Sequence, residues 1–287
     1  MAIPSAPTLE LPGPSLIQVI RGIQRDGFLS YIGQLWHQHG DFFQLKMAGR
    51  QLIFAIHPDA VRHVNVEQRQ HYDKAASYDV VRRYLLGNGL VASTGELWRR
   101  QRKLMAPFYT PRGVQTYAEL MLRDGQRLVE RWEQLAAQGQ PVEISEEMTT
   151  VTASIILQAM FSMQASSDIL RLKDAVETMI GFVGQAQGPL PMLPTWVPTR
   201  RNRHYLQSRE LVHRYISGLI ATRRATPQDD WPDDLLTRLM QARDEDGASM
   251  DEELLRDESI TTFFAGHETT ARTMTFTRSE ERRVGKE

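Results

Sequence analysis

One uninterrupted stretch near the C-terminal end, residues 250–277, constrains the fold more than any other part of the sequence. It contains no proline, and Ser249 and Asp251 are suitable N-cap residues ahead of an acidic first turn. The stretch therefore predicts a single long helix, which at about 1.5 Å per residue would measure roughly 40 Å. A helix of that length can cross a domain, so the other elements are expected to pack around it.

Small side chains follow one face of this predicted helix. They recur at the three- and four-residue spacing of a helix, at Thr262, Ala265, Gly266, Thr269, Thr270 and Thr273. A glycine inside a helix costs about 1 kcal/mol relative to alanine, and adjacent threonines are poor helix formers. Two interpretations stay open. The stripe is a packing seam for another helix, or a flat ligand lies against it with Glu268 and Thr269 as a neighbouring acid and alcohol.

Composition excludes several other kinds of site. The sequence has no cysteine, which removes disulfides, thiolate metal sites and cysteine nucleophiles from this chain. Its 34 basic and 35 acidic residues give a net charge of −1, so nothing global indicates binding to nucleic acid. The N-terminal residues do not resemble a signal peptide, and no long apolar run predicts a membrane span. We therefore expect a cytoplasmic protein.

The remaining periodicity predicts a mainly α fold with a small β-sheet. Residues 42–47 and 52–56 alternate apolar and polar side chains around a short turn, which is typical of a β-hairpin. Helical spacing of apolar residues extends over most of the rest of the chain. The predicted helices before the long one cover residues 16–23, 28–39, 60–66, 113–137, 145–163, 170–185, 202–224 and 235–242.

A basic helix is predicted to begin after residues 93–96, Ser-Thr-Gly-Glu, which fit an N-terminal capping box. Trp98 and Arg102 lie four residues apart and so project from one face. An indole N–H and a guanidinium on one face are well suited to holding a carboxylate. Three more cations, Arg99, Arg100 and Lys103, form either a solvated face or a surface for an acidic protein partner.

Two of these stretches together resemble a known family. Residues 264–271, Phe-Ala-Gly-His-Glu-Thr-Thr-Ala, resemble the central helix of the haem-thiolate monooxygenases, the cytochrome P-450 family. The Trp98 to Arg102 spacing resembles the same family's Trp-x-x-x-Arg signature. Lys74, in Tyr-Asp-Lys ahead of it, is similar to a lysine that some members use. The motifs occur in the family's order, and the resemblance extends to about Thr277.

The resemblance implies roles for particular residues. Trp98, Arg102 and Lys74 would hold the haem propionates. On the central helix, Ala265 and Gly266 would line the haem. The catalytic residues would be Thr269, which hydrogen-bonds bound oxygen, and Glu268, which relays protons. The implied reaction inserts one oxygen atom from O2 into a small apolar substrate, with electrons from a ferredoxin, flavodoxin or reductase.

The same resemblance implies that the chain is incomplete. Without a cysteine it cannot supply the thiolate ligand of the haem iron, so no metal site is predicted in this chain. We expect residues 1–277 to be the N-terminal part of one domain, an incomplete cytochrome P-450 fold. Residues 278–287, with seven charges, are predicted to be a non-native tail. Haem is expected only in the full-length protein, and the chain alone is predicted to be inactive.

Two other classes compete with this interpretation. The first is a non-enzymatic helical protein in which the small-residue stripe is a packing seam. The second is a metal-dependent hydrolase that uses His267 and Glu268, the start of the zinc-protease pattern His-Glu-x-x-His. Ala271 occupies the place of the second histidine, which excludes the two-histidine zinc site of that pattern.

Overall fold

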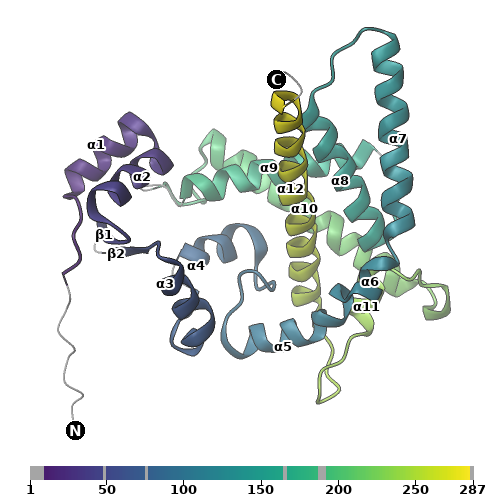
Figure 1. Ribbon diagram of the computed structural model, residues 1–287. Helices are drawn as coiled ribbons and strands as arrows, with labels where there is room; N and C mark the ends of the chain where they lie inside the picture. Colours follow the sequence, from purple (N-terminus) through teal and green to yellow (C-terminus); the bar gives the residue numbers. More distant parts are fainter. Residues whose placement is uncertain (1–9, 48–49, 75–76, 164–166, 187–191, 285–287) are drawn as a thin grey trace. The chain divides into compact units, whose positions relative to one another are not determined.

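The computed structural model describes residues 10–47, 50–74, 77–163, 167–186 and 192–284 (Figure 1). The chain divides into two compact units, residues 1–73 with 189–191 and residues 74–188 with 192–287. The described residues are mainly helical, with one antiparallel pair of strands. The predicted fold class, mainly α with a small β-sheet, is therefore confirmed.

The first unit is built around the predicted hairpin. Strands β1 (Phe42–Met47) and β2 (Arg50–Ala55) pair antiparallel, with Phe43 opposite Phe54, and the turn residues 48 and 49 lie outside the described residues. Two helices precede it, α1 (Leu16–Asp26) and α2 (Phe28–His39). Short helical segments follow it: α3 (Pro58–Arg62), η1 (His63–Glu67) and η2 (Arg69–His71). A small core joins them, formed by Val19, Tyr31, Leu35, Phe43 and Leu45.

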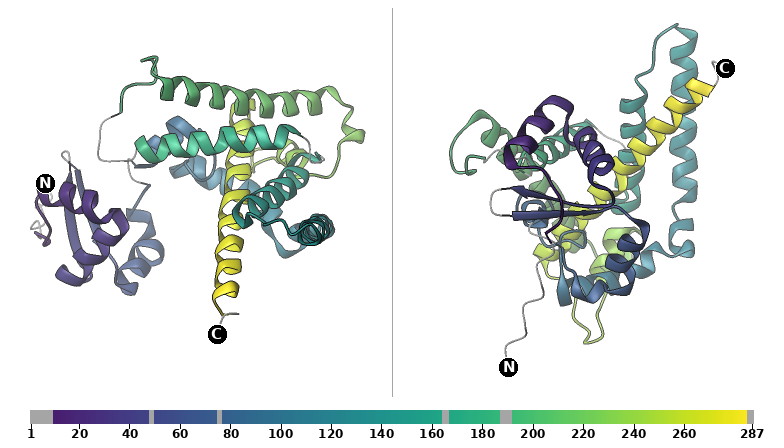
Figure 2. Two further views of the ribbon diagram at one scale, coloured as in Figure 1. Left: turned by 90° about the horizontal axis from the view of Figure 1, so that it is seen from above. Right: turned by 60° about the vertical axis from the view of Figure 1, so that its left-hand side comes forward.

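The second unit packs its helices around α12 (Glu252–Val284), the long helix that the sequence predicts. Helix α12 lies along α8 (Ile144–Phe161), and α9 (Ser167–Ala186) and α10 (Arg200–Ala225) lie side by side across it (Figure 2). The other elements are α4 (Ser77–Val81), η3 (Arg82–Leu86), α5 (Gly95–Met105), η4 (Ala106–Tyr109), α6 (Pro111–Gln115), α7 (Ala118–Ala137), η5 (Gln228–Asp230) and α11 (Leu235–Gln241).

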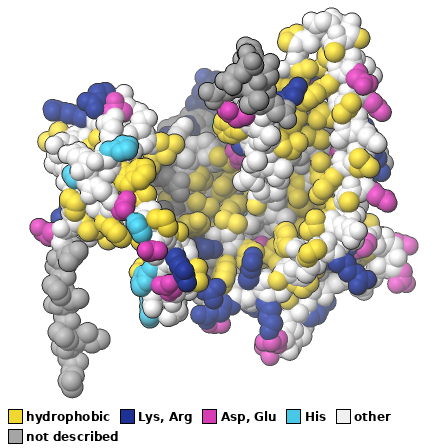
Figure 3. All heavy atoms as spheres, viewed as in Figure 1, with side chains coloured by type: hydrophobic (Ala, Val, Ile, Leu, Met, Phe, Trp, Pro, Cys, Tyr) yellow, Lys and Arg dark blue, Asp and Glu magenta, His cyan; other side chains and the backbone are white. Residues whose placement is uncertain are grey.

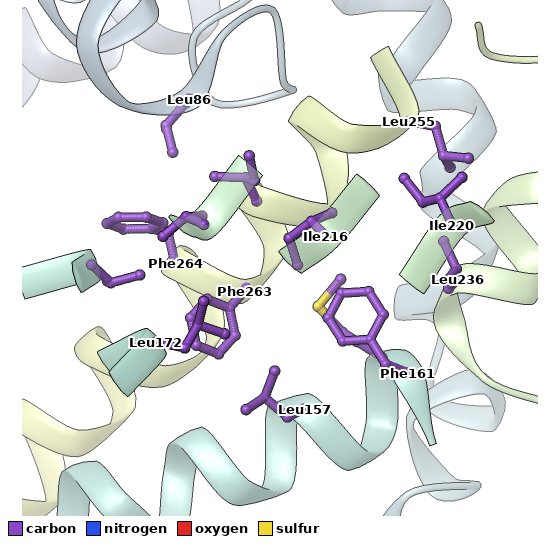
Figure 4. Close-up of a cluster of buried hydrophobic side chains, with 14 of the residues drawn as sticks. Leu86, Leu157, Phe161, Leu172, Ile216, Ile220, Leu236, Leu255, Phe263 and Phe264 are labelled. Atoms are coloured by element: carbon purple, nitrogen blue, oxygen red, sulfur yellow. The ribbon is translucent and has the colours of Figure 1, made fainter. Parts of the chain in front are cut away.

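Apolar side chains from α8, α10 and α12 meet in the core of this unit. Phe263 of α12 lies among Leu157 of α8 and Ile216 of α10, and Phe161 closes the same cluster (Figure 4). Each of these four side chains is at most 4% exposed. The part of α12 from Leu254 to Phe264 is thus held by apolar burial, at roughly 1.5–3 kcal/mol for each fully buried large side chain.

A buried ion pair fixes α11 against α10. Arg223 and Asp234 are 2.6 Å apart, and their side chains are 10% and 2% exposed. Asp234 also caps α11 by accepting a hydrogen bond from the Thr237 N–H at 2.9 Å. The Ser162 hydroxyl, just beyond α8, donates to the same carboxylate at 2.9 Å. One carboxylate therefore connects three helices.

Several local predictions need correction. The helix predicted over residues 113–137 is interrupted between α6 and α7. The capping box of α5 is wrong, because Thr94 is the N-cap and the Ser93 hydroxyl, 1% exposed, donates to Gln101 instead. Asp251 does cap α12, accepting from the Leu254 N–H at 2.7 Å. That helix continues through the charged residues to Val284, past the predicted end at residue 277.

One face of α7 carries apolar side chains that the described residues leave exposed. Met121, Leu122 and Val129 lie within α7 and Val114 lies in α6 just before it, so that apolar side chains recur at intervals of seven or eight residues. Each of these side chains is more than 40% exposed. Figure 3 shows hydrophobic side chains gathered on the visible face of the second unit, with charged side chains beside them. Contiguous exposed apolar surface of this kind commonly marks an interaction site.

Candidate functional site

The predicted stripe on α12 divides between two environments. Thr262 is buried, whereas Ala265, Thr269, Thr270 and Thr273 are exposed. Gly266 belongs to the contact with α8, where an added Cβ would lie 2.7 Å from the Ile156 Cδ1 atom. Both interpretations of the stripe are thus partly realised. Gly266 lets α8 approach closely, and the other small residues leave a face of α12 uncovered by described residues.

Glu268 and Thr269 lie at this uncovered face. The Thr269 hydroxyl donates to the Ala265 carbonyl at 2.8 Å, so its oxygen lone pairs stay available as acceptors. The Glu268 side chain is 34% exposed, and its Oε1 atom is 3.7 Å from the Arg272 guanidinium. An ion pair of that length and exposure is weak, so the carboxylate can exchange partners.

His267 faces away from Glu268 into the core. Its ring is 1% exposed, stacks on Phe263 with centroids 4.8 Å apart, and makes a 2.9 Å contact from Nδ1 to the Phe263 carbonyl. Within the described part of the chain, no group of three His, Cys, Asp or Glu side chains could hold a metal ion. The hydrolase alternative therefore gains no support from these residues.

Trp98 and Arg102 leave their donors open on α5. Trp98 is partly buried and Arg102 is exposed. Neither the indole N–H nor the guanidinium has a hydrogen-bond or ion-pair partner among residues that the structure describes. An indole and a guanidinium held in this way can still accept a carboxylate ligand, which is what the sequence prediction requires.

The other cations of α5 all have acidic partners. Arg100 contacts Asp244 at 2.6 Å, Lys103 pairs with Glu245, and Arg99 pairs with Glu96. The hydrogen bond from Arg100 lowers the pKa of Asp244, with further help from the Ala248 N–H. The predicted basic surface for an acidic partner is therefore a mixed-charge surface in the structure.

Lys74 holds the loop ahead of α5. Its ammonium donates to the carbonyls of Leu90 at 3.1 Å, Val91 at 2.7 Å and Ser93 at 2.8 Å. An ammonium has three N–H donors, and these three carbonyls can take them all. The described hydrogen bonds of the Lys74 ammonium therefore go to the loop ahead of α5, and none of them goes to Trp98 or Arg102.

Sequence reasoning missed two buried acids on α12. Asp257 and Glu258 are 3% and 0% exposed. The Asp257 carboxylate accepts from the Asn88 N–H at 2.8 Å, and the Glu258 carboxylate accepts from the Leu90 N–H at 3.0 Å. Burial raises the pKa of both carboxyl groups, that of Glu258 to about 7. The sequence around them, from Arg256 to Thr262, is mostly polar, so it gives no signal that these two acids are buried.

These groups suit a flat cofactor that carries acid groups. Ala265 and Thr269 present little bulk on the uncovered face of α12, and the donors of Trp98 and Arg102 are open. Haem has a flat ring and two carboxylates, so the residues present fit it. The chain contains no cysteine, so the thiolate ligand of a haem iron is not among its residues.

The mainly helical fold, the small side chains on α12 and the open donors of Trp98 and Arg102 on α5 resemble the features expected of a haem-thiolate oxidoreductase. The sequence matches the cytochrome P-450 family over residues 7–277. The chain therefore belongs to this family.

Three similar proteins come from Streptomyces. Cyclooctatin synthase of Streptomyces melanosporofaciens is 28% identical, with 83% of this chain and 51% of that protein covered. Cyclooctat-9-en-7-ol 5-monooxygenase of the same organism is 30% identical, over 83% of this chain and 50% of that protein. Pentalenene oxygenase of Streptomyces avermitilis is 27% identical, over 83% and 51%. The chain spans about half the length of these relatives.

No helix among the described residues is both long and apolar enough to span a membrane.

Proposed function

We propose that this chain is the N-terminal half of a monooxygenase that inserts one oxygen atom from O2 into a small apolar organic substrate. The observation that carries the proposal is the uncovered small-residue face of α12, which bears Glu268 and Thr269. The open donors of Trp98 and Arg102 on α5 support it. We further propose that the exposed apolar face of α7 is covered by the other half of the protein.

Haem, when bound, supplies the iron centre for oxygen activation, with its thiolate ligand coming from outside this chain. Arg102 would hold a propionate through its guanidinium, and the Trp98 N–H would donate to the same acid group. Ala265 would keep the face flat where the ring lies. Gly266 would act indirectly, by letting α8 hold this part of α12 in place.

Thr269 and Glu268 would manage protons at the oxygen-binding position. The Thr269 hydroxyl now donates to the Ala265 carbonyl. Turning that hydroxyl toward a ligand costs one helix back-bond, about 1 kcal/mol, which a new hydrogen bond offsets. Glu268 is only weakly paired with Arg272 and can swing to relay protons from solvent.

The remaining partners are proposals of the same kind. Two relatives are named for pentalenene and cyclooctat-9-en-7-ol, and we propose a small apolar substrate of similar character here. Electrons would come from a ferredoxin, flavodoxin or reductase. Such a partner would have to displace Asp244 or Glu245 before it could reach Arg100 or Lys103. A cytoplasmic location stays a prediction.

A non-enzymatic helical protein is the second candidate, and one observation favours it. Gly266 does lie in a close helix contact with Ile156, as a packing seam requires. The seam does not extend to Ala265, Thr269 or Thr273, which the described residues leave exposed. A purely structural role does not explain why these exposed positions carry small side chains, so the enzymatic proposal accounts for more of the stripe.

The test uses the full-length polypeptide, obtained by following the genomic reading frame beyond the codon for Thr277. Arg102→Leu is expected to lower the haem-to-protein ratio of the purified protein, because a propionate loses its guanidinium partner. Arg99→Leu, on the same helix and paired with Glu96, is the matched control and should retain haem. Unchanged haem retention in the Arg102 variant would contradict the proposed site.

A second variant tests the chemistry separately. Glu268→Gln should lower turnover by about 100-fold while haem content stays normal, because general acid–base groups typically contribute on that order. Turnover equal to that of the unmodified enzyme would remove Glu268 from the mechanism.

A further inference from the structure

The loop between η3 and α5, residues 87–94, lies against the N-terminal half of α12 (Figure 1). It has no regular structure of its own, so its backbone groups need partners from elsewhere. Two of its N–H groups find them on α12. The Asn88 N–H donates to Asp257 at 2.8 Å and the Leu90 N–H donates to Glu258 at 3.0 Å.

Two cationic side chains donate hydrogen bonds to the carbonyl groups of the same loop. Lys74 donates to three of its carbonyls, and the Arg82 guanidinium donates to the Ala92 carbonyl at 2.7 Å. The Gly89 carbonyl accepts within the loop, from the N–H groups of Ala92 and Ser93. Acids therefore hold the donors and cations hold the acceptors. Charge-assisted hydrogen bonds from the two cations, together with the hydrogen bonds to the two acids, make an irregular segment rigid.

Two glycines permit the close approach of this loop to α12. Gly87 has a φ of +54°, and a Cβ atom there would overlap the Asp257 carboxylate. A Cβ atom at Gly89 would overlap the Thr261 hydroxyl. Any side chain at either position would push the loop away from the helix and break the hydrogen bonds to the two acids.

The peptide groups of Asn88 connect α12 to α5. Its N–H reaches Asp257 on α12, and its carbonyl accepts from the Gln101 side chain on α5 at 2.8 Å. Gln101 is 0% exposed, and its other amide atom accepts from the Ser93 hydroxyl at 2.5 Å. Gln101 immediately precedes Arg102 in the helix, so this contact acts on the part of α5 that carries the open donors.

We propose that Asp257 and Glu258 are positioning residues that, through the loop at Asn88 and through Gln101, hold α5 in one place along α12. The consequence for haem rests on the proposed function, in which α5 supplies Trp98 and Arg102 as propionate partners. The connection itself depends only on contacts within this chain.

Simple stabilisation does not explain the arrangement. Two neighbouring carboxylates with 3% and 0% exposure are expensive to bury, and apolar side chains of similar size would stabilise a helix contact at least as well. What carboxylates add is direction, because each accepts from one particular N–H. A fixed register between loop and helix is therefore the property that these two residues supply.

The chain's lack of cysteine allows a direct distance measurement. Cysteines introduced at Arg99 on α5 and Thr273 on α12, both exposed, take spin labels, and pulsed electron paramagnetic resonance gives the distribution of distances between them. Asp257→Leu removes the acceptor, and Asp257→Asn keeps an oxygen acceptor at the same place. Ser259→Ala is the matched control, because Ser259 is equally buried and bonds only to Leu255 of its own helix.

We expect one narrow distribution for the parent and for the Ser259→Ala protein, a similar one for Asp257→Asn, and a broad or shifted one for Asp257→Leu. Rescue by asparagine separates positioning from a general loss of stability. An unchanged distribution in Asp257→Leu would overturn the proposal. Equal broadening in the leucine, asparagine and alanine proteins would overturn it as well.

A second measurement covers the case in which Asp257→Leu does not fold. Gln101→Leu breaks the same connection from the α5 side. The rate of amide hydrogen exchange in the peptides covering residues 86–105 should rise about tenfold or more, because losing one buried hydrogen bond destabilises the segment by a corresponding amount. Unchanged exchange would overturn the proposal. Both measurements are made without haem. A negative result in them would overturn the connection between α12 and α5 but not the proposed function. A failure to bind haem would overturn the proposed function but not this connection.

Discussion

The buried carboxyl group of Glu258 predicts a specific dependence of stability on pH. Burial is the largest cause of its raised pKa; the Leu90 N–H opposes the shift and Asp257 adds to it. The pKa rises from 4.5 to about 7 in the folded chain. Between these values the folded state holds a proton that the unfolded state has released. The stability contributed by this group is therefore complete below pH 4.5 and is lost as the pH rises toward 7.

The magnitude follows from the size of the shift. A difference of about 2.5 pH units, 7 minus 4.5, corresponds at 1.36 kcal/mol per unit to about 3 kcal/mol lost by pH 8, an upper value. Glu258→Gln keeps an oxygen acceptor for the Leu90 N–H but cannot ionise. We therefore expect the glutamine protein to match the parent near pH 4 and to exceed it by as much as about 3 kcal/mol at pH 8.

Urea unfolding followed by far-ultraviolet circular dichroism between pH 4 and 8 measures this difference. Subtracting parent from variant at each pH removes most contributions of the other carboxyl groups. Glu253→Gln, on the same helix with a side chain 75% exposed, is the control and should show little dependence on pH. A difference that stays flat across this range, or one that grows toward low pH, would refute the assignment of a buried, hard-to-ionise Glu258.

Two further predictions concern packing and a buried charge. Gly266→Val should cost about 1–3 kcal/mol because its side chain collides with Ile156, and Ile156→Ala should recover part of that cost in thermal unfolding. Equal costs in both backgrounds would contradict the contact. Asp234→Ala should destabilise the chain by about 3–5 kcal/mol, since it leaves Arg223 buried without its partner. Removing the exposed Glu210 of the Arg214 pair should cost less than about 1 kcal/mol, and similar losses in the two variants would refute the buried-pair reasoning.

Local signals were sufficient for much of the fold. Alternating side chains located β1 and β2, and the acidic turn after Asp251 located the start of α12. Helix α2 lies at its predicted bounds, because Gly40 after His39 is a strong local stop signal. These features depend on interactions within a few residues, which a single sequence displays.

The errors came from contacts between distant segments. Ser93 fits a capping box by spacing, but the burial of Gln101 draws its hydroxyl away from the helix end. Arg100 and Lys103 read as unpaired cations until the segment carrying Asp244 and Glu245 folds beside them. No local pattern contains such pairings.

The sequence suggested candidate site residues only where their motifs are local. Glu268 and Thr269 were proposed because their motif lies within one helix, and Trp98 and Arg102 because their motif spans four residues of another. Their roles toward a haem stay predictions. Asp257 was missed because its partner, the Asn88 N–H, is 169 residues away in the sequence. Backbone partners of this kind leave no residue-type signature.

The measurement that tests the central claim most directly is the absorption spectrum of the full-length polypeptide expressed with a supply of haem. If a haem lies on the small-residue face of α12 with a cysteine ligand from the other half of the protein, the purified protein will show a Soret band. Its reduced form will show the carbon monoxide difference band of a thiolate-ligated haem. A folded, soluble full-length protein with neither band would contradict the account.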